Sequence, residues 1–430
     1  MTATPRSAAE SVTVFIATSV AVLSIMLPLS FSNLGSFVHV DLLVFNIPRV
    51  MSAAAFVAVT TAAVLVAASS TRAALWTALL GQAGILFNHL VILPISDRSH
   101  FTGLSLPTLN FIDALLAGAV VGAIAVAVWR DRVQRGVYLF AMVGATVLGD
   151  LTETPTDGDN DGFDSVLGGT LPLWFVGASV LALGYFAATS GATHAITDDA
   201  IPLAPVFAAV ILFSTILVSA LAIAADKDSA LTLVIGGVAT VLAATAAAFI
   251  LPGRDGVLLL LMTSFSVAGS LVVTLPRPGW VDGATLIFVG VGLYAGLHWR
   301  RPSAAAACVT VMAALTLASD TSFRATPGAV AVIGCMGLGA AVGYCVGTGL
   351  PADPASGVVG LVVLFVPSLG VALADPDVDQ LAYSESWYRA IGHERGPVPA
   401  TVAMCVAIGC SLAIALLVRV RPAPVDPYGA

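Results

Sequence analysis

Three polar residues inside two neighbouring apolar segments, Asn88, His89 and Asp113, could carry chemistry in this chain. Asp113 lies about five residues into an apolar run that begins near residue 108. An ionised carboxylate in lipid costs at least about 3 kcal/mol, so such residues normally face the protein interior or a water-filled cavity. Burial also favours the protonated form of a carboxyl group, which suits a site that binds and releases a proton.

Asn88 and His89 lie about seven residues from the outer end of the preceding apolar run. That run crosses in the opposite direction, and consecutive elements commonly pack together, so these residues can meet Asp113 at a similar depth. A His–Asp pair can hold or pass a proton at physiological pH. The alternative is a structural hydrogen bond between two helices.

A second polar group, His39, Asp41 and Arg49, precedes the second apolar run. Pro48 favours an extended conformation at Ile47, so we expect a short interfacial segment before the helix. Arg49 can pair with Asp41 or Asp113, or bind an anionic substrate or lipid headgroup at a cavity mouth. The alternative is an arginine that extends its charge to the interface.

The loop TDGDNDGFD resembles the start of a calcium-binding loop, with Asp157, Asp159 and Asp161 at alternate positions and Gly162 next. Alternate carboxylates can converge on one hard cation, and glycine permits the sharp turn. The expected glutamate at the last position is Gly168, so we expect at most weak Ca²⁺ binding, with a solvated acidic loop as the alternative.

The composition is that of a polytopic membrane protein. Hydrophobic residues make up 58% of the chain and charged residues 10%, against roughly 25% charged in soluble domains. A run of about 20 apolar residues is needed to cross a hydrocarbon core of about 30 Å. Fourteen such runs are predicted, at 11–33, 50–69, 74–96, 108–129, 137–150, 171–189, 202–224, 230–251, 256–275, 282–298, 303–319, 328–348, 357–374 and 400–418.

The arginine clusters predict the orientation. RDRVQR, HWRR and VRVR all fall on the side of the N-terminus, which the positive-inside rule makes cytoplasmic. Because the predicted number of spans is even, we expect both termini on the cytoplasmic side of a plasma membrane. The bias to arginine over lysine, with much alanine, valine and glycine, indicates a GC-rich, bacterial source. The sequence has no basic patch in which aromatic residues alternate with basic ones, so we expect no nucleic-acid partner.

In the stretch 108–150, the first span ends in VWRDRVQRG, and a glycine-containing span follows. This stretch resembles helices four and five of the major facilitator superfamily. Fourteen spans divided as six, two and six resemble the drug:proton antiporter branch. SSTRAALW (69–76) takes the place of the family's Gly-x-x-x-Asp-Arg-x-Gly-Arg-Arg turn but keeps only Arg72, and Asp150 stands where the antiporters have proline.

The resemblance implies two six-helix bundles, residues 1–190 and 255–430, joined by two extra helices and a linker at 191–254. It also implies alternating access between the bundles. We therefore expect a secondary transporter that exports an amphipathic or lipid-like solute in exchange for protons.

The alternative is a membrane scaffold or accessory subunit of a cell-envelope pathway, which the scarcity of charge favours. No hydrolase, nucleotide-binding or metalloprotease motif occurs, and we expect no enzyme activity and no cofactor besides the weak Ca²⁺. An intramembrane transferase would depend on the loop at 375–399, where Asp375, Asp377, Glu385 and His393 could act.

Overall fold

The computed structural model describes residues 5–27, 40–98, 104–152, 171–190, 201–225, 229–272, 280–322, 327–366 and 398–421. Within these ranges the chain forms helices and short connections and no β-strand. The prediction of an all-helical, multi-pass membrane protein is confirmed.

In the part of the chain that the structure describes, a helix or a series of consecutive helices lies at each predicted apolar run, in the same order along the chain. The first six spans are formed by α1 (Pro5–Met26), α2 (Val40–Ala68), α3 (Thr71–Phe87) with η1 (Asn88–Ile92) and α4 (Leu93–Arg98), α5 (Leu106–Val128), α6 (Arg132–Thr152) and α8 (Leu173–Thr189). The next eight are formed by α9 (Leu203–Ala225), α10 (Ala230–Ile250), α11 (Gly256–Val272), α12 (Trp280–His298), α13 (Pro302–Ser322), α14 (Pro327–Gly349), α15 (Pro354–Val362) with η2 (Val363–Phe365), and α17 (Val398–Val420). Among the described residues, nine helices are long and apolar enough to span a membrane, and four more are apolar but shorter.

Three helices, α1, α2 and α6, begin five or more residues earlier than expected. The helix α6 starts at Arg132 because the Asp131 carboxylate accepts the N–H groups of Val133 and Gln134 at 2.8 and 3.0 Å, which caps the first turn. The extended conformation that we expected before Pro48 is wrong, since α2 is helical from Val40 and continues through the proline. Proline is tolerated inside transmembrane helices, where neighbouring groups satisfy the freed backbone carbonyl.

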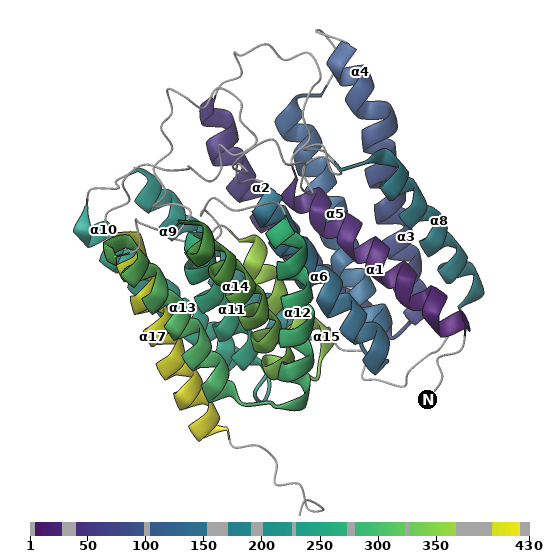
Figure 1. Cartoon of the computed structure of the whole chain (residues 1–430). Coiled ribbons are helices and arrows are strands. Elements are labelled where there is room, and N and C mark those ends of the chain that lie inside the picture. The colour runs from purple at the N-terminus through teal and green to yellow at the C-terminus, as the bar shows by residue number, and fades with distance from the viewer. Residues whose placement is uncertain are drawn as a thin grey trace, which may run out of the picture.

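The helices divide into two groups (Figure 1), and six helix pairings of one group recur at equivalent positions in the other. In the first, α1 packs against α5, α6 and α8, α2 packs against α5, and α3 packs against α5 and α8. In the second, α11 packs against α14, α15 and α17, α12 packs against α14, and α13 packs against α14 and α17. The pairs are thus formed by helices at equivalent positions in two runs of six.

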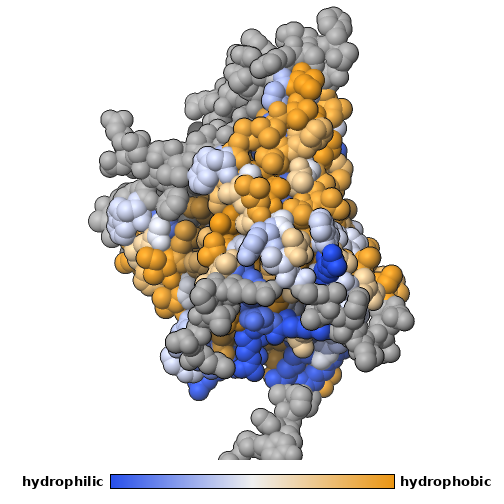
Figure 2. All heavy atoms as spheres, turned by 90° about the vertical axis from the view of Figure 1, so that its right-hand side faces the viewer, coloured by the Kyte–Doolittle hydropathy of each residue, from blue (hydrophilic) through white to orange (hydrophobic). Residues whose placement is uncertain are grey.

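The remaining helices, α9 and α10, pack on each other, with α9 also against α2 and α10 against α11 and α17. The two groups meet where α2 contacts α15 and where α6 contacts α12. In Figure 1, α1 begins and α17 ends at the lower end of the molecule. Figure 2 shows an apolar band above hydrophilic residues that gather at that same end.

In each group one pair of helices packs closely through glycine residues: α2 with α5, and α12 with α14. A β-carbon at Gly118 or Gly122 would overlap the carbonyl groups of α2, and one at Gly292 or Gly343 would overlap the facing backbone in the other pair. Membrane helices lack a hydrophobic force between them, so close backbone approach supplies much of the packing energy. Glycine therefore allows the backbones of these two helix pairs to approach each other closely.

Trp129, directly after α5, connects the two groups. Its indole N–H donates to the carbonyl of Ala352 at 3.0 Å, just before α15, and its side chain is buried. A β-carbon at Gly357 would overlap the indole ring. A glycine in α15 therefore makes room for a tryptophan from the other group.

We expect Trp129→Phe to lower the free energy of unfolding by about 1 kcal/mol, because the Ala352 carbonyl loses its donor. Thermal unfolding in detergent micelles would measure the change. Trp174→Phe is the matched control, since Trp174 is 70% exposed and should tolerate the same substitution. Equal melting temperatures for the two variants would show that the indole hydrogen bond contributes nothing.

Candidate functional site

The helices that carry Asn88, His89 and Asp113 start at serine caps. The Ser70 hydroxyl accepts the N–H of Ala73 at 3.2 Å at the start of α3. The Ser105 hydroxyl accepts the N–H of Thr108 at 3.4 Å at the start of α5, and Pro107 occupies the first turn. Both features favour helix initiation at these positions, which sets the register of the two helices.

Two glycines let α3 approach α5 closely. A β-carbon at Gly81 would lie 2.6 Å from Val120 Cγ2, and one at Gly84 would lie 2.9 Å from Leu116 Cδ1. Larger residues would force the helices apart. The short distance between the helices is what allows the following residues of α3 to form hydrogen bonds with α5.

The α-helical pattern of α3 gives way to a π-turn at the site itself. The N–H of Leu93 donates to the carbonyl of Asn88, five residues earlier, and η1 spans Asn88–Ile92. Such π-turns are rare and often mark functional positions. Here the widened turn begins where two consecutive side chains, those of Asn88 and His89, both reach the same carboxyl group.

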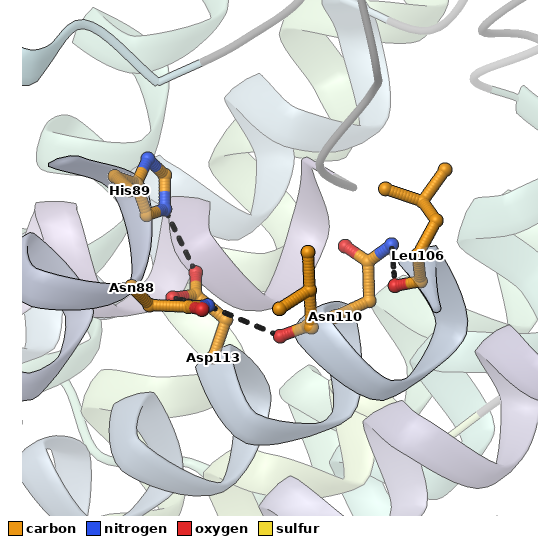
Figure 3. Close-up of polar contacts among 6 residues, drawn as sticks. Asn88, His89, Leu106, Asn110 and Asp113 are labelled. Atoms are coloured by element: carbon orange, nitrogen blue, oxygen red, sulfur yellow. Dashed lines mark hydrogen bonds and ion pairs between the residues drawn. The ribbon is translucent and has the colours of Figure 1, made fainter. Parts of the chain in front are cut away.

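The side chains of Asn88 and His89 both form hydrogen bonds with the carboxyl group of Asp113 (Figure 3). Asn88 Nδ2 lies 3.0 Å from Asp113 Oδ1 and 3.2 Å from the carbonyl of Leu109. His89 Nε2 lies 3.1 Å from Asp113 Oδ2. The exposed fractions of Asn88, His89 and Asp113 are 0%, 7% and 2%. The expected meeting of these three residues at one depth is thus observed.

This geometry can hold one proton in either of two places. When the Asp113 carboxylate is ionised, the His89 Nε2–H donates to it, and the Asn88 amide donates to the other oxygen. When Asp113 is protonated, its hydroxyl can donate to an unprotonated Nε2. Both arrangements keep the heavy atoms in place, so a proton can be taken up or released with little structural cost.

Several buried polar atoms have no hydrogen-bond partner among the described residues. Asn88 Oδ1 and both amide atoms of Gln82 are of this kind, and Gln82 lies two turns before His89 on α3. Others are hydroxyl groups on α1 and α11, at Thr18, Ser24 and Ser264. An unpaired buried polar group costs about 1–3 kcal/mol. Such groups would be satisfied if water or a solute entered between the helices.

The other predicted site residues do not join this network in the described structure. Arg49 lies in α2, is exposed, and forms no described ion pair with Asp113, whose partners are Asn88 and His89. Asp41 belongs to the first turn of α2.

The remaining predicted residues, His39 and the calcium-loop residues Asp157, Asp159 and Asp161, lie outside the described residues. Within the described ranges, no group of three or more His, Cys, Asp or Glu side chains could hold a metal ion.

Sequence reasoning missed two features of the site, the π-turn and the carbonyl of Leu109 as an acceptor. It also missed Asp282, a second buried acid at the start of α12, which is 4% exposed. The only available signal for Asp282 was its position just inside an apolar run. The glycines Gly81 and Gly84 could have indicated the close approach of α3 to its partner.

Comparisons with known proteins give structural neighbours but no sequence relatives. No protein-family profile matches the chain, and no curated protein matches it. The fold is similar to FucP, a major facilitator superfamily transporter solved in the outward conformation, at 12% identity and a TM-score of 0.48, over 94% of this chain and 98% of that one. It is also similar to the E. coli fucose:proton symporter FucP in a second structure, at 15% identity and a TM-score of 0.42, over 94% and 97% of the two chains. A D-xylose–proton symporter matches at 12% identity and a TM-score of 0.46, over 94% and 95%.

Proposed function

We propose that this protein is a proton-coupled secondary transporter of the major facilitator type. The observation that carries the proposal is the His89–Asp113 pair, 3.1 Å apart and buried between two membrane-spanning helices. Ionisable residues inside membrane spans are costly, and they commonly mark ion or proton pathways. Asp113 is the residue that would bind the coupled proton, with His89 and Asn88 holding its carboxyl group in place.

The helix packing supports the transporter architecture. Six of the pairwise contacts among helices α1 to α8 recur among helices α11 to α17, with α9 and α10 packed beside the two groups. Repeated units that can move against each other are the usual basis of alternating access. We propose two moving bundles, residues 1–190 and 255–430, with residues 191–254 as the inserted part.

The solute is proposed to be amphipathic or lipid-like, and the direction export. The unpaired buried groups are amides and hydroxyls rather than charges, and apolar residues surround them. Unpaired amides and hydroxyls among apolar residues suit a molecule with a large apolar part and a few polar groups. The six-two-six layout, which resembles that of the drug:proton antiporters, favours export.

The proposal also includes the orientation in a plasma membrane. The arginine clusters at Arg130–Arg135, Arg300–Arg301 and Arg419–Arg421 favour a cytoplasmic location for the end at which α5, α12 and α17 finish. Both termini would then be cytoplasmic.

The test is solute-driven proton movement in liposomes. Purified protein is reconstituted with a pH-sensitive dye inside, and gradients of hydrophobic cations and of lysolipids are applied. We expect at least one solute to drive a pH change in the wild type, and Asp113→Asn to reduce it to the level of protein-free liposomes. The reason is that an amide cannot exchange a proton as a carboxyl group does.

Asp282→Asn is the matched control, because Asp282 is similarly buried but lies on α12 in the other group. A pH change that survives in Asp113→Asn would remove Asp113 from the coupling step. The absence of any pH change in wild type, with the variant folded normally, would favour the scaffold alternative, in which the pair is a structural hydrogen bond.

A further inference from the structure

The register between α6 and α12 brings two arginine-bearing segments together. Gly144 of α6 faces Leu286 of α12, and Gly290 of α12 faces Phe140 of α6. Residue numbers thus rise along α6 as they fall along α12, so the two helices run antiparallel. Continued by two further turns, this register places the first turn of α6 beside the last turn of α12 and the residues that follow it.

Three arginines meet at this point. Arg132 and Arg135 are three residues apart in the first turn of α6 and share a face of the helix. Arg300 follows the end of α12. The Arg135 guanidinium lies over the Trp129 ring, 6.0 Å from its centroid. Partial burial lowers the pKa of Arg135 below its usual value, and the nearby positive charges of Arg300 and then Arg132 lower it further.

The nearby carboxylates are engaged elsewhere. Asp131 accepts the backbone N–H groups of Val133 and Gln134, and Glu10 accepts the side-chain amide of Gln134 at 3.0 Å. In the described parts of the chain, no ion pair joins Arg132, Arg135 or Arg300 to an acid. Like charges that converge repel each other, and a bound anion would relieve that repulsion.

We propose that Arg132, Arg135 and Arg300 bind the phosphate group of an anionic phospholipid at the end of α6 and α12. Guanidinium groups present paired N–H donors that match phosphate oxygens. Basic pockets between transmembrane helices at the cytoplasmic side are suited to lipid headgroups.

Neighbouring aromatic residues indicate a lipid rather than free phosphate. Trp299 and Tyr294, at the end of α12, are 67% and 64% exposed. Tryptophan and tyrosine are enriched at the level of the headgroups. The arginines therefore lie beside a surface that fits the interface between acyl chains and headgroups.

The site would join the two helix groups. Arg132 and Arg135 belong to the first group and Arg300 to the second, and Trp129 under Arg135 already donates to the Ala352 carbonyl across the same boundary. A bound headgroup adds a further link at this end of the molecule. An anionic lipid would thus stabilise the contact between the two helix groups at this end.

The test is lipid binding, which does not depend on transport. Full-length protein, delipidated in a neutral detergent, is titrated with phosphatidylglycerol, phosphatidylcholine or inorganic phosphate. Binding is measured by native mass spectrometry and by the melting temperature. We expect phosphatidylglycerol to bind and raise the melting temperature, and phosphatidylcholine and phosphate to have little effect. Arg132→Gln and Arg300→Gln should each weaken phosphatidylglycerol binding about fivefold.

Arg301→Gln is the matched control, since it removes the same charge one residue away and Arg301 does not act on Arg135. It should bind phosphatidylglycerol like the wild type. Equal weakening in all three variants would reveal general charge attraction and overturn the site. A melting-temperature rise with inorganic phosphate equal to that with phosphatidylglycerol would overturn the lipid assignment. No phosphatidylglycerol binding by the wild type would overturn the proposal altogether.

Discussion

An Asp113→Ala variant is expected to lose about 3 kcal/mol of unfolding free energy, because the substitution breaks a buried pair and leaves its partners unpaired. The Asn88 amide would keep only the Leu109 carbonyl, and His89 Nε2 would keep no described partner. Denaturation with SDS in mixed micelles would measure the loss.

The Asp113→Asn variant separates the contribution of Asp113 to stability from its contribution to proton movement. Its side-chain oxygen can still accept from Asn88, and its amide can donate to an unprotonated His89 Nε2, so we expect a loss of only about 1 kcal/mol. A stable Asp113→Asn protein that no longer moves protons would assign Asp113 a role in coupling. If the pair is only a structural hydrogen bond in a protein that still moves protons, proton movement should be unchanged in Asp113→Asn.

A double-mutant cycle with His89→Ala tests the pair directly. Because the two side chains are in contact, their effects should deviate from additivity by about 1–3 kcal/mol. Strictly additive effects would mean that the His89–Asp113 contact contributes no energy.

The second large effect is expected from the glycines that pack helix against helix. A β-carbon at Gly122 would overlap the Ala58 carbonyl, and one at Gly343 would overlap the Val289 carbonyl. Each obstacle is backbone, which cannot rotate away as a side chain can. We expect Gly122→Ala and Gly343→Ala each to lower the unfolding free energy by about 3 kcal/mol, measured by the same SDS denaturation.

Gly237→Ala is the control for these variants. No atom lies within 4 Å of a β-carbon at Gly237 in α10. Alanine should therefore be neutral there or stabilise the helix by up to about 1 kcal/mol, from its higher helix propensity. If Gly122→Ala and Gly343→Ala behaved like this control, the close packing of α2 with α5 and of α12 with α14 would be disproved.

Much of the architecture could be predicted from the sequence. The predicted spans agree with the observed helices to within a few residues at most ends, because bilayer thickness sets the length of an apolar run. The meeting of Asn88 and His89 with Asp113 was also predictable. Two consecutive spans run antiparallel, so residues at equal depth from the same surface lie at the same level.

The predicted starts of α2 and α6 were wrong, because features outside the apolar runs decided where these helices begin. Proline biases the preceding residue away from the helix, yet α2 continues through Pro48, because helical hydrogen bonding is the main way to satisfy a backbone in lipid. The predicted start of the fifth span was late because the capping by Asp131 lies outside the apolar run that defined it.

By itself, the sequence determined that this is a multi-pass membrane protein, where the apolar helices of the described residues lie, and that one His–Asp pair could form within them. Only the tertiary structure decided which carbonyl Asn88 binds, that Trp129 reaches Ala352, and that Arg135 lies near Arg300. These contacts depend on how each helix is rotated about its axis and on which distant helix it faces. Helices that are apolar on all sides carry no periodic signal for either.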